Sequence, residues 1–141
     1  MDTVSLPPSP ATVLCTLDLR TETHPPRHAR SALRDVLRRH TRVRLSPEQM
    51  EAAVLVVSEL VTNACRHTPG PVELRVLWRA SHLVVQVEDR SPAIPAVTPC
   101  EGRGDCGGYG LLLVEELTDN WTVETGPCGK TVEVTLRREL G

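Results

Sequence analysis

Glu59-Leu-Val-Thr-Asn63-Ala-Cys-Arg-His67 lies within a segment of strongly helical character. Residues four apart stack on one face of a helix, so Glu59, Asn63 and His67 form a polar stripe. A carboxylate can act as a general base, and a carboxamide oxygen can ligate a hard cation. The alternative is the ordinary solvent-facing side of an amphipathic helix. This stretch alone does not decide between the two. The same segment carries an apolar stripe made of Val54, Val57, Val61 and Ala64.

The composition limits the classes of function. The 141 residues suit one domain with its own core. A net charge of -2 provides no broad basic field for nucleic acid or an acidic membrane. The N-terminus has no signal-peptide pattern, and no apolar stretch approaches membrane-spanning length. The five cysteines form no C-x-x-C pair, which favours reduced thiols over a disulfide framework or zinc site. These features predict a cytoplasmic protein.

The periodicity predicts a flexible tail at residues 1–10 and a single domain at residues 11–141. Strands are expected over residues 11–20, 72–79, 83–89, 121–125 and 131–138, and helices over 25–40, 47–67 and 109–117. In the first strand, Val13 is expected to share one face with Cys15. Ser46 and Gln49 complete a capping box at the start of the long helix. Helices grouped on one face of a mixed, mostly antiparallel sheet make an α+β fold, a two-layer α/β sandwich.

Asp89 stands at the end of a predicted strand. It shares the parity of Leu83, Val85 and Val87, so it is expected to point to the core side. An unpaired buried carboxylate costs several kcal/mol, so Asp89 needs a partner, and a donor group on a ligand is one candidate. In the alternative interpretation the strand has already ended and Asp89 caps the turn at Ser91.

Five glycines fall within the nine residues 102–110, directly before an apolar helical segment. Glycine lets backbone N–H groups approach a ligand, and a helix N-terminus carries partial positive charge, so the pattern suits an anion. It is neither a Walker A motif nor a dinucleotide fingerprint. A flexible linker is the alternative, although loops as long as residues 91–108 are usually functional or disordered.

Three motifs follow one another in the sequence: E-L-V-T-N-A-C-R-H, V-E-D-R-S-P-A-I-P and G-G-Y-G-L-L-L-V. Together they resemble the GHKL, or Bergerat-fold, ATP-binding superfamily. The compact single-domain form is similar to the anti-sigma-factor serine/threonine kinases of the RsbW and SpoIIAB type. The D-x-S-x-x-x-P variant is similar to small ATP-binding regulators of actinobacteria. The resemblance covers nearly the whole chain, from about residue 11 to residue 138.

The resemblance implies a role for each matching residue. Glu59 matches the catalytic base, which takes the proton from a substrate serine hydroxyl. Asn63 matches the ligand of the Mg²⁺ ion that bridges the ATP phosphates. Asp89 matches the acceptor for the adenine amino group. Gly108 and Gly110 match a glycine box whose backbone contacts the phosphates, and a lid at about residues 92–108, with Gly102 to Gly107, would cover the nucleotide. Gly104 and Leu111 are counted among the cofactor-binding residues as well.

Three positions depart from the family pattern. Ser91 and Ala93 stand where glycines are frequent, and Lys130 stands where a threonine is frequent. Lys130 shares the parity of Val132 and Val134, so we expect it on the nucleotide side and count it among the cofactor-binding residues. His67 fits the pattern, but two roles stay open for it: an interaction with the carbonyls of the helix end, or a phosphate contact.

The resemblance implies an ATP- and Mg²⁺-dependent serine/threonine kinase in a partner-switching pathway. Such a protein binds a sigma factor in one state and phosphorylates an anti-sigma-factor antagonist in another. A homodimer is expected of the family, whereas nucleic acid and membrane are not expected as direct partners. The alternative is a non-catalytic ATP-binding module that uses nucleotide as a conformational switch. A third class, the ATPase domain of a histidine kinase or topoisomerase-like machine, usually comes with further domains.

Overall fold

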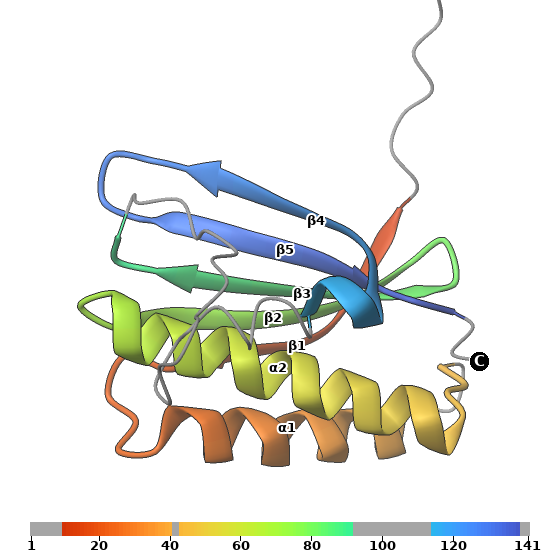
Figure 1. Cartoon of the computed structure of the whole chain (residues 1–141). Helices are drawn as coiled ribbons and strands as arrows, with labels where there is room; N and C mark the ends of the chain where they lie inside the picture. Colours follow the sequence, from red (N-terminus) through yellow and green to blue (C-terminus); the bar gives the residue numbers. More distant parts are fainter. Residues whose placement is uncertain (1–9, 41–42, 92–113, 139–141) are drawn as a thin grey trace, which may run out of the picture.

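The structure is a computed structural model that describes residues 10–40, 43–91 and 114–138. Strands and helices form two layers (Figure 1). The helices are α1 (Pro25–Arg39) and α2 (Pro47–His67), and a further helical turn covers residues 114–117. The strands are β1 (Ala11–Asp18), β2 (Pro71–Arg79), β3 (His82–Asp89), β4 (Thr118–Thr125) and β5 (Lys130–Leu136).

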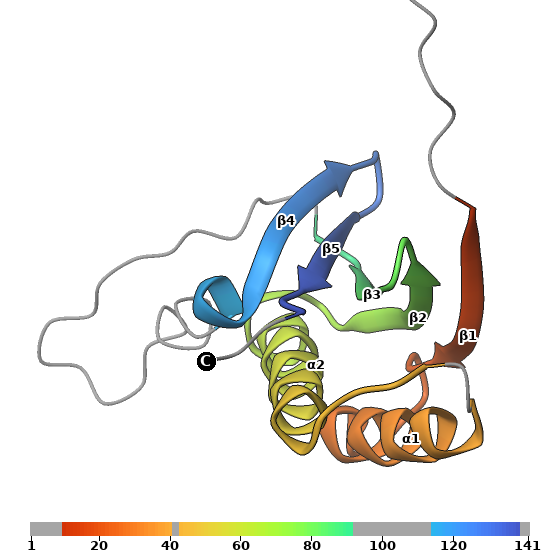
Figure 2. The same cartoon turned by 90° about the vertical axis from the view of Figure 1, so that its right-hand side faces the viewer.

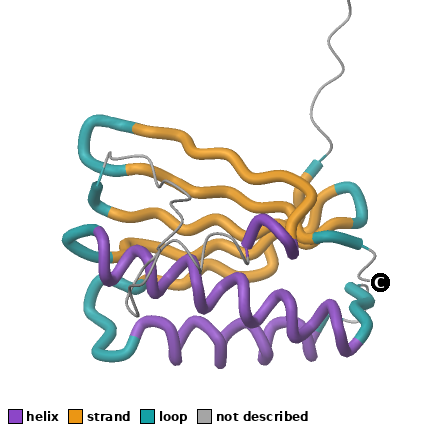
Figure 3. Tube along the Cα trace, viewed as in Figure 1, coloured by secondary structure: helices purple, strands orange, loops and turns teal. Residues whose placement is uncertain are grey.

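The five strands form one sheet in the order β1-β2-β3-β5-β4, and each of its pairs is antiparallel. The helices lie together on one face of this sheet (Figure 3). Helix α1 contacts β1 and β2, and α2 contacts β2, β3 and β5. Seen end on, α2 lies between α1 and the turn at residues 114–117 (Figure 2). The predicted α+β two-layer sandwich is confirmed, and the described sheet is antiparallel throughout.

Local sequence signals account for the bounds of α2. Ser46 Oγ accepts a hydrogen bond from the Gln49 N–H at 3.1 Å, and Gln49 Oε1 accepts one from the Ser46 N–H at 2.8 Å. This reciprocal capping box satisfies two backbone donors at the helix start. Gly70 has a φ of +147°, which turns the chain into β2. Helix α2 buries its apolar side against the sheet and α1, through Ala52, Ala53, Val56, Val57, Leu60, Val61 and Ala64.

The two edge strands differ from expectation. The prediction that Val13 shares the core face with Cys15 is wrong, since Val13 is 56% exposed. The β1–β2 register shifts between these residues, and such an irregularity changes which side chains face the core. Strand β4 begins at Thr118, earlier than predicted, because Thr118 already pairs with Leu136 of β5. Of the helix expected at residues 109–117, residues 114–117 are helical and the rest lie outside the described part.

Three segments meet at the end of the sheet that is on the left in Figure 1. Strand β3 ends at Asp89, which pairs with Pro71 on one side and with Lys130 on the other. The Arg90 N–H donates a hydrogen bond of 3.2 Å to the Gly70 carbonyl. The last turn of α2, the end of β3 and the start of β5 therefore lie close together.

The turn between β4 and β5, residues 126–129, approaches the end of β3 closely. A Cβ atom on Gly129 would lie 2.0 Å from the Asp89 carbonyl oxygen and 3.3 Å from the Arg90 Cα atom. Both obstacles are backbone atoms, so no side-chain rotation can relieve the overlap. Glycine is therefore required at residue 129 for β5 to begin directly opposite Asp89.

We predict that Gly129→Ala lowers the free energy of unfolding by about 3 kcal/mol, because the strand start must move to make room. Gly126→Ala is the matched control, since its added Cβ would find its nearest neighbour, the Gly129 carbonyl oxygen, at 3.8 Å. Urea denaturation of both variants measures the difference. Equal stability of the two variants would contradict the close approach.

Candidate functional site

Helix α2 presents Glu59 and Asn63 on the flank that faces away from α1. The opposite flank is marked by Ser58, whose Oγ accepts a hydrogen bond of 2.8 Å from Arg30 Nη1 of α1. Asn63 lies about 140° around the helix from Ser58. Glu59 and Asn63 are both half-buried, whereas His67 at the helix end is exposed. The first two residues therefore do not form an ordinary solvent-facing surface.

The side-chain amide of Asn63 is incompletely satisfied. Its Nδ2 atom is buried and has no hydrogen-bond partner, and within the described chain it is the one buried side-chain polar atom in this condition. Buried polar groups are normally paired, so each exception calls for an explanation. The two ends of an amide are assigned from their hydrogen bonds, so the unpaired position can accommodate a donor or an acceptor. A polar ligand is the explanation that fits this flank.

Glu59 lies one helical turn before Asn63. No residue of the described segments forms a hydrogen bond or ion pair with its carboxylate. A carboxylate that is half-buried and uncommitted keeps its lone pairs for an incoming proton donor. Glu59 thus meets the geometric requirement of a general base, and Asn63 meets that of a ligand for a hard cation.

Asp89 combines the two roles that the sequence left open. It is 4% exposed, which places its carboxylate on the core side of the sheet. Its Oδ1 atom accepts a hydrogen bond of 2.8 Å from the Ser91 N–H, so Asp89 also caps the turn that follows β3. The burial demands a compensating charge, and that charge comes from within the chain.

Lys130 supplies the compensating charge. Its Nζ atom lies 2.8 Å from Asp89 Oδ2, and both side chains are 5% exposed. The same Nζ donates a hydrogen bond of 3.2 Å to the Ser91 carbonyl. Lys130 shares the buried side of β5 with Val132 and Val134, the side expected from its parity. The sequence did not reveal the ion pair itself. The available signals were the shared core-side parity and opposite charges of Asp89 and Lys130 at neighbouring strand ends.

Four of the predicted site residues lie in the described part of the chain, and two of them, Asp89 and Lys130, are in direct contact. Glu59 and Asn63 lie on the C-terminal half of α2, and Asp89 and Lys130 lie at the adjoining strand ends (Figure 1). The other predicted contacts fall outside the described residues: Gly104, Gly108, Gly110, Leu111 and the lid at about residues 92–108.

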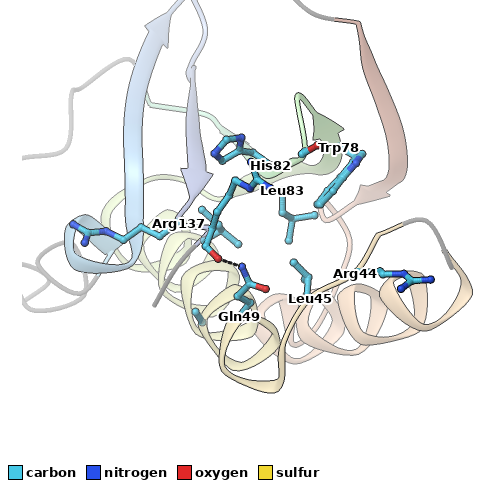
Figure 4. Close-up of a pocket in the computed structure, with 11 residues that line it drawn as sticks. Arg44, Leu45, Gln49, Trp78, His82, Leu83 and Arg137 are labelled. Carbon is cyan, nitrogen blue, oxygen red and sulfur yellow. Dashed lines mark hydrogen bonds between the residues drawn. The ribbon is translucent and has the colours of Figure 1, made fainter. Parts of the chain in front are cut away.

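Among the cavities lined by described residues, two border the sheet. One, of about 770 Å³, lies at the end that holds Asp89 and Lys130, and the β4–β5 turn lines it as well. The other, of about 350 Å³, lies at the opposite end and contains none of the predicted site residues (Figure 4). There Leu45 and Leu83 point into the space, while the guanidinium groups of Arg44 and Arg137 point away from it.

None of the described helices combines the length and apolar character that crossing a bilayer requires.

The fold is that of ATPase domains of the GHKL class. Residues 23–136 match the family described as histidine kinase-like ATPase domain, HATPase_c_2. The chain belongs to this family, and the predicted superfamily is confirmed.

Individual relatives agree with this assignment. The sensor protein kinase PmrB of Pseudomonas aeruginosa is 34% identical over a stretch that covers 45% of this chain and 16% of PmrB. Among solved structures, the RsbU and RsbW domains of Rv1364c from Mycobacterium tuberculosis give a TM-score of 0.64 at 20% identity, covering 92% of this chain and 33% of that one. The blue-light activated histidine kinase EL346 of Erythrobacter litoralis gives 0.52 at 23% identity, covering 86% and 42%. These structural likenesses establish the fold. The chain spans only a minor part of each relative.

We predict that Lys130→Met lowers the free energy of unfolding by about 3 kcal/mol, because it leaves the buried Asp89 carboxylate without its counter-charge. The double variant Asp89→Asn/Lys130→Met should recover most of this loss, since it removes both charges and keeps an acceptor for the Ser91 N–H. Urea denaturation measures both effects.

The matched control is Arg79→Met on the uncovered face of the sheet. Arg79 Nη2 lies 3.0 Å from Glu133 Oε2, and the two side chains are 30% and 26% exposed. A pair this open to water is worth at most about 1 kcal/mol. A Lys130→Met loss no larger than that of the control would show that the buried pair does not carry the stability assigned to it.

Proposed function

We propose that this chain binds ATP together with Mg²⁺ and acts as a cytoplasmic serine/threonine kinase of the anti-sigma-factor type. In this proposal it binds a sigma factor in one state and phosphorylates an anti-sigma-factor antagonist in another. Membership of the ATPase-domain family and a fold shared with an RsbW domain support the proposal. The substrate and the partners are assigned by analogy with that kinase type.

One observation carries the proposal: Glu59 and Asn63 share a flank of α2 that is half-buried and lacks polar partners among the described residues. Phosphoryl transfer needs a cation on the phosphates and a group that receives the proton of the attacking hydroxyl. A carboxamide and an uncommitted carboxylate one turn apart provide these two functions on a rigid helix. A purely structural polar flank would be expected to satisfy the buried Asn63 amide internally.

The residues present fit a magnesium nucleotide. Asn63 would hold Mg²⁺ through its carboxamide oxygen, and its amide nitrogen would donate to a phosphate oxygen. Mg²⁺, when bound, supplies positive charge that offsets the negative charge of the phosphates. Each Asp89 oxygen accepts one bond from the described residues and retains a lone pair, so the carboxylate still has capacity for the amino group of adenine.

Glu59 has the proposed role of proton acceptor. Its carboxylate would accept the proton of a serine or threonine hydroxyl while the hydroxyl oxygen attacks the terminal phosphorus. The bond from that phosphorus to the bridging oxygen would break, and ADP would leave with the electron pair. A positioned base of this kind contributes roughly 10²- to 10⁴-fold to a rate. Asn63, one turn away on the same helix, would keep the phosphates in line with that hydroxyl.

The second candidate function is a nucleotide-responsive binding module without phosphoryl transfer. The Asp89–Lys130 pair favours this candidate, because it satisfies the buried carboxylate without any ligand. A site that is already neutral gains less from binding a base than one with an uncompensated carboxylate. Measurement of transfer separates the two candidates.

We predict that saturating Mg-ATP, at about a hundred times its Kd, raises the free energy of unfolding by about 2.7 kcal/mol, because the ligand binds only the folded state. At the same concentration, Asn63→Ala should lose about half of this stabilisation or more, since it removes a group that holds the phosphates and their cation. Thermal-shift titration provides the measurement. Asn120→Ala on the exposed part of β4 is the matched control. A full shift in Asn63→Ala would remove Asn63 from the site.

We predict that Glu59→Gln binds Mg-ATP as the wild type does and transfers phosphate about a hundredfold more slowly or worse, because it loses the proton acceptor. Transfer of a radiolabelled γ-phosphate to purified candidate antagonist proteins measures the rate. Glu51→Gln, at an exposed position two turns earlier on α2, controls for the loss of a negative charge. Equal rates in wild type and Glu59→Gln would refute the assigned role. ATP binding by the wild type without transfer to any antagonist would favour the non-catalytic module.

A further inference from the structure

The Asp89–Lys130 pair keeps unused hydrogen-bonding capacity. An ammonium group has three N–H donors. Lys130 uses one toward Asp89 Oδ2 and one toward the Ser91 carbonyl. In the described part of the chain, the third donor has no acceptor. Asp89 likewise retains free lone pairs. A donor and an acceptor thus stand side by side at the end of the sheet.

Several contacts hold this donor in place. Lys130 lies directly opposite Asp89 in the β3–β5 register, and the close approach of Gly129 to the Asp89 backbone sets that register. Lys130 is 6% exposed, so water competes little for its third donor and a bond made there is strengthened. Lys130 is also the single lysine among the 16 lysine and arginine residues of the chain. An ammonium is a compact charge with freely rotating donors, which a planar guanidinium cannot reproduce.

We propose that Lys130 determines which purine the site accepts, and that it admits 6-oxopurine nucleotides as well as adenine nucleotides. The inference rests on the proposed function, since it requires that a nucleotide base lie against Asp89. A carboxylate alone accepts a bond from a 6-amino group and repels the oxygen of a 6-oxo group. With Lys130 beside it, a 6-oxo oxygen meets an N–H donor and a locally neutral pair.

The same pair serves both kinds of base. A 6-aminopurine donates its amino hydrogen to Asp89, and the third Lys130 N–H donates to a neighbouring ring nitrogen. A 6-oxopurine accepts the Lys130 N–H at its oxygen, and its N1–H donates to Asp89. Both arrangements keep the buried charges paired, so neither carries the free-energy cost of an unpaired charge in a site of low exposure. Without Lys130 the first arrangement loses the bond to the ring nitrogen but keeps the bond from the 6-amino group to Asp89. In the second arrangement the 6-oxo oxygen loses its donor and lies beside a carboxylate with no counter-charge.

The test compares binding of Mg-ATP and Mg-ITP by calorimetry. ITP carries hypoxanthine, which lacks the 2-amino group of guanine. Hypoxanthine and adenine therefore differ only in the group at position 6 and in the proton on N1. The wild type should bind ITP within about tenfold of ATP, and Lys130→Thr should raise the ITP-to-ATP ratio of Kd values by about tenfold or more, the usual effect of one hydrogen bond to a charged group. Arg79→Met, which removes a cation from the uncovered face, should leave the ratio unchanged.

The outcomes distinguish the two proposals. Binding of ATP with an unchanged ratio in Lys130→Thr overturns the role of Lys130 and leaves the proposed function standing. So does a wild type that binds ATP and rejects ITP. Failure of the wild type to bind either nucleotide overturns both proposals.

A second measurement needs no variant. Labelling with ¹⁵N-lysine gives one side-chain ammonium signal, that of Lys130. The signal should shift on addition of either nucleotide. A shift with Mg-ATP and none with Mg-ITP would overturn the inference.

Discussion

The packing of α2 against the sheet is the constraint on which the site depends. Seven apolar residues of this helix are buried. Burial of this many side chains stabilises by several kcal/mol and leaves the helix no freedom to rotate about its axis. With that rotation fixed and Ser58 bonded to α1, the flank that bears Glu59 and Asn63 is directed away from α1. The packing of the core therefore holds the Asn63 amide nitrogen in a buried position without a partner, whereas on an isolated helix the same group would be hydrated.

The sheet imposes the second constraint. Asp89 is buried because β3 continues the alternation of its apolar residues to the last position. Lys130 at the start of β5 supplies the counter-charge that this buried carboxylate requires. The pair forms only if β5 begins directly opposite Asp89, which requires the missing Cβ of Gly129. The β4–β5 turn is thus a part of the site even though its own residues carry no assigned chemistry. Helix and sheet position two halves of one site by independent means.

Local signals predicted most of the fold. The capping box at Ser46 and Gln49 and the turn residues after His67 lie within or next to α2, so its bounds were predictable to the residue. The bulge in β1 was not, because it depends on pairing with a strand far along the chain. For the site, helical spacing predicted the shared flank of Glu59 and Asn63. Parity predicted the buried sides of Asp89 and Lys130, but their contact depends on a register between distant strands, which periodicity within one strand does not encode.

In the proposed function, the ion pair would connect recognition of the base with Ser91, the residue that follows the end of β3 by two positions. Ser91 is bonded to both members of the pair, through its N–H to Asp89 and through its carbonyl to Lys130. A ligand that bonds to either charged group therefore acts on the bonds that hold Ser91, the last described residue before 92–113. Because Asp89 and Lys130 are nearly excluded from water, water does not screen the interaction between their charges. A new bond to one of these side chains therefore changes the strength of its bond to the other. The same argument applies to a kinase and to a switch module. In both proposals the nucleotide base and the Ser91 backbone would form hydrogen bonds with the same two residues, Asp89 and Lys130. A change in the bonds to the base would therefore alter the bonds to Ser91.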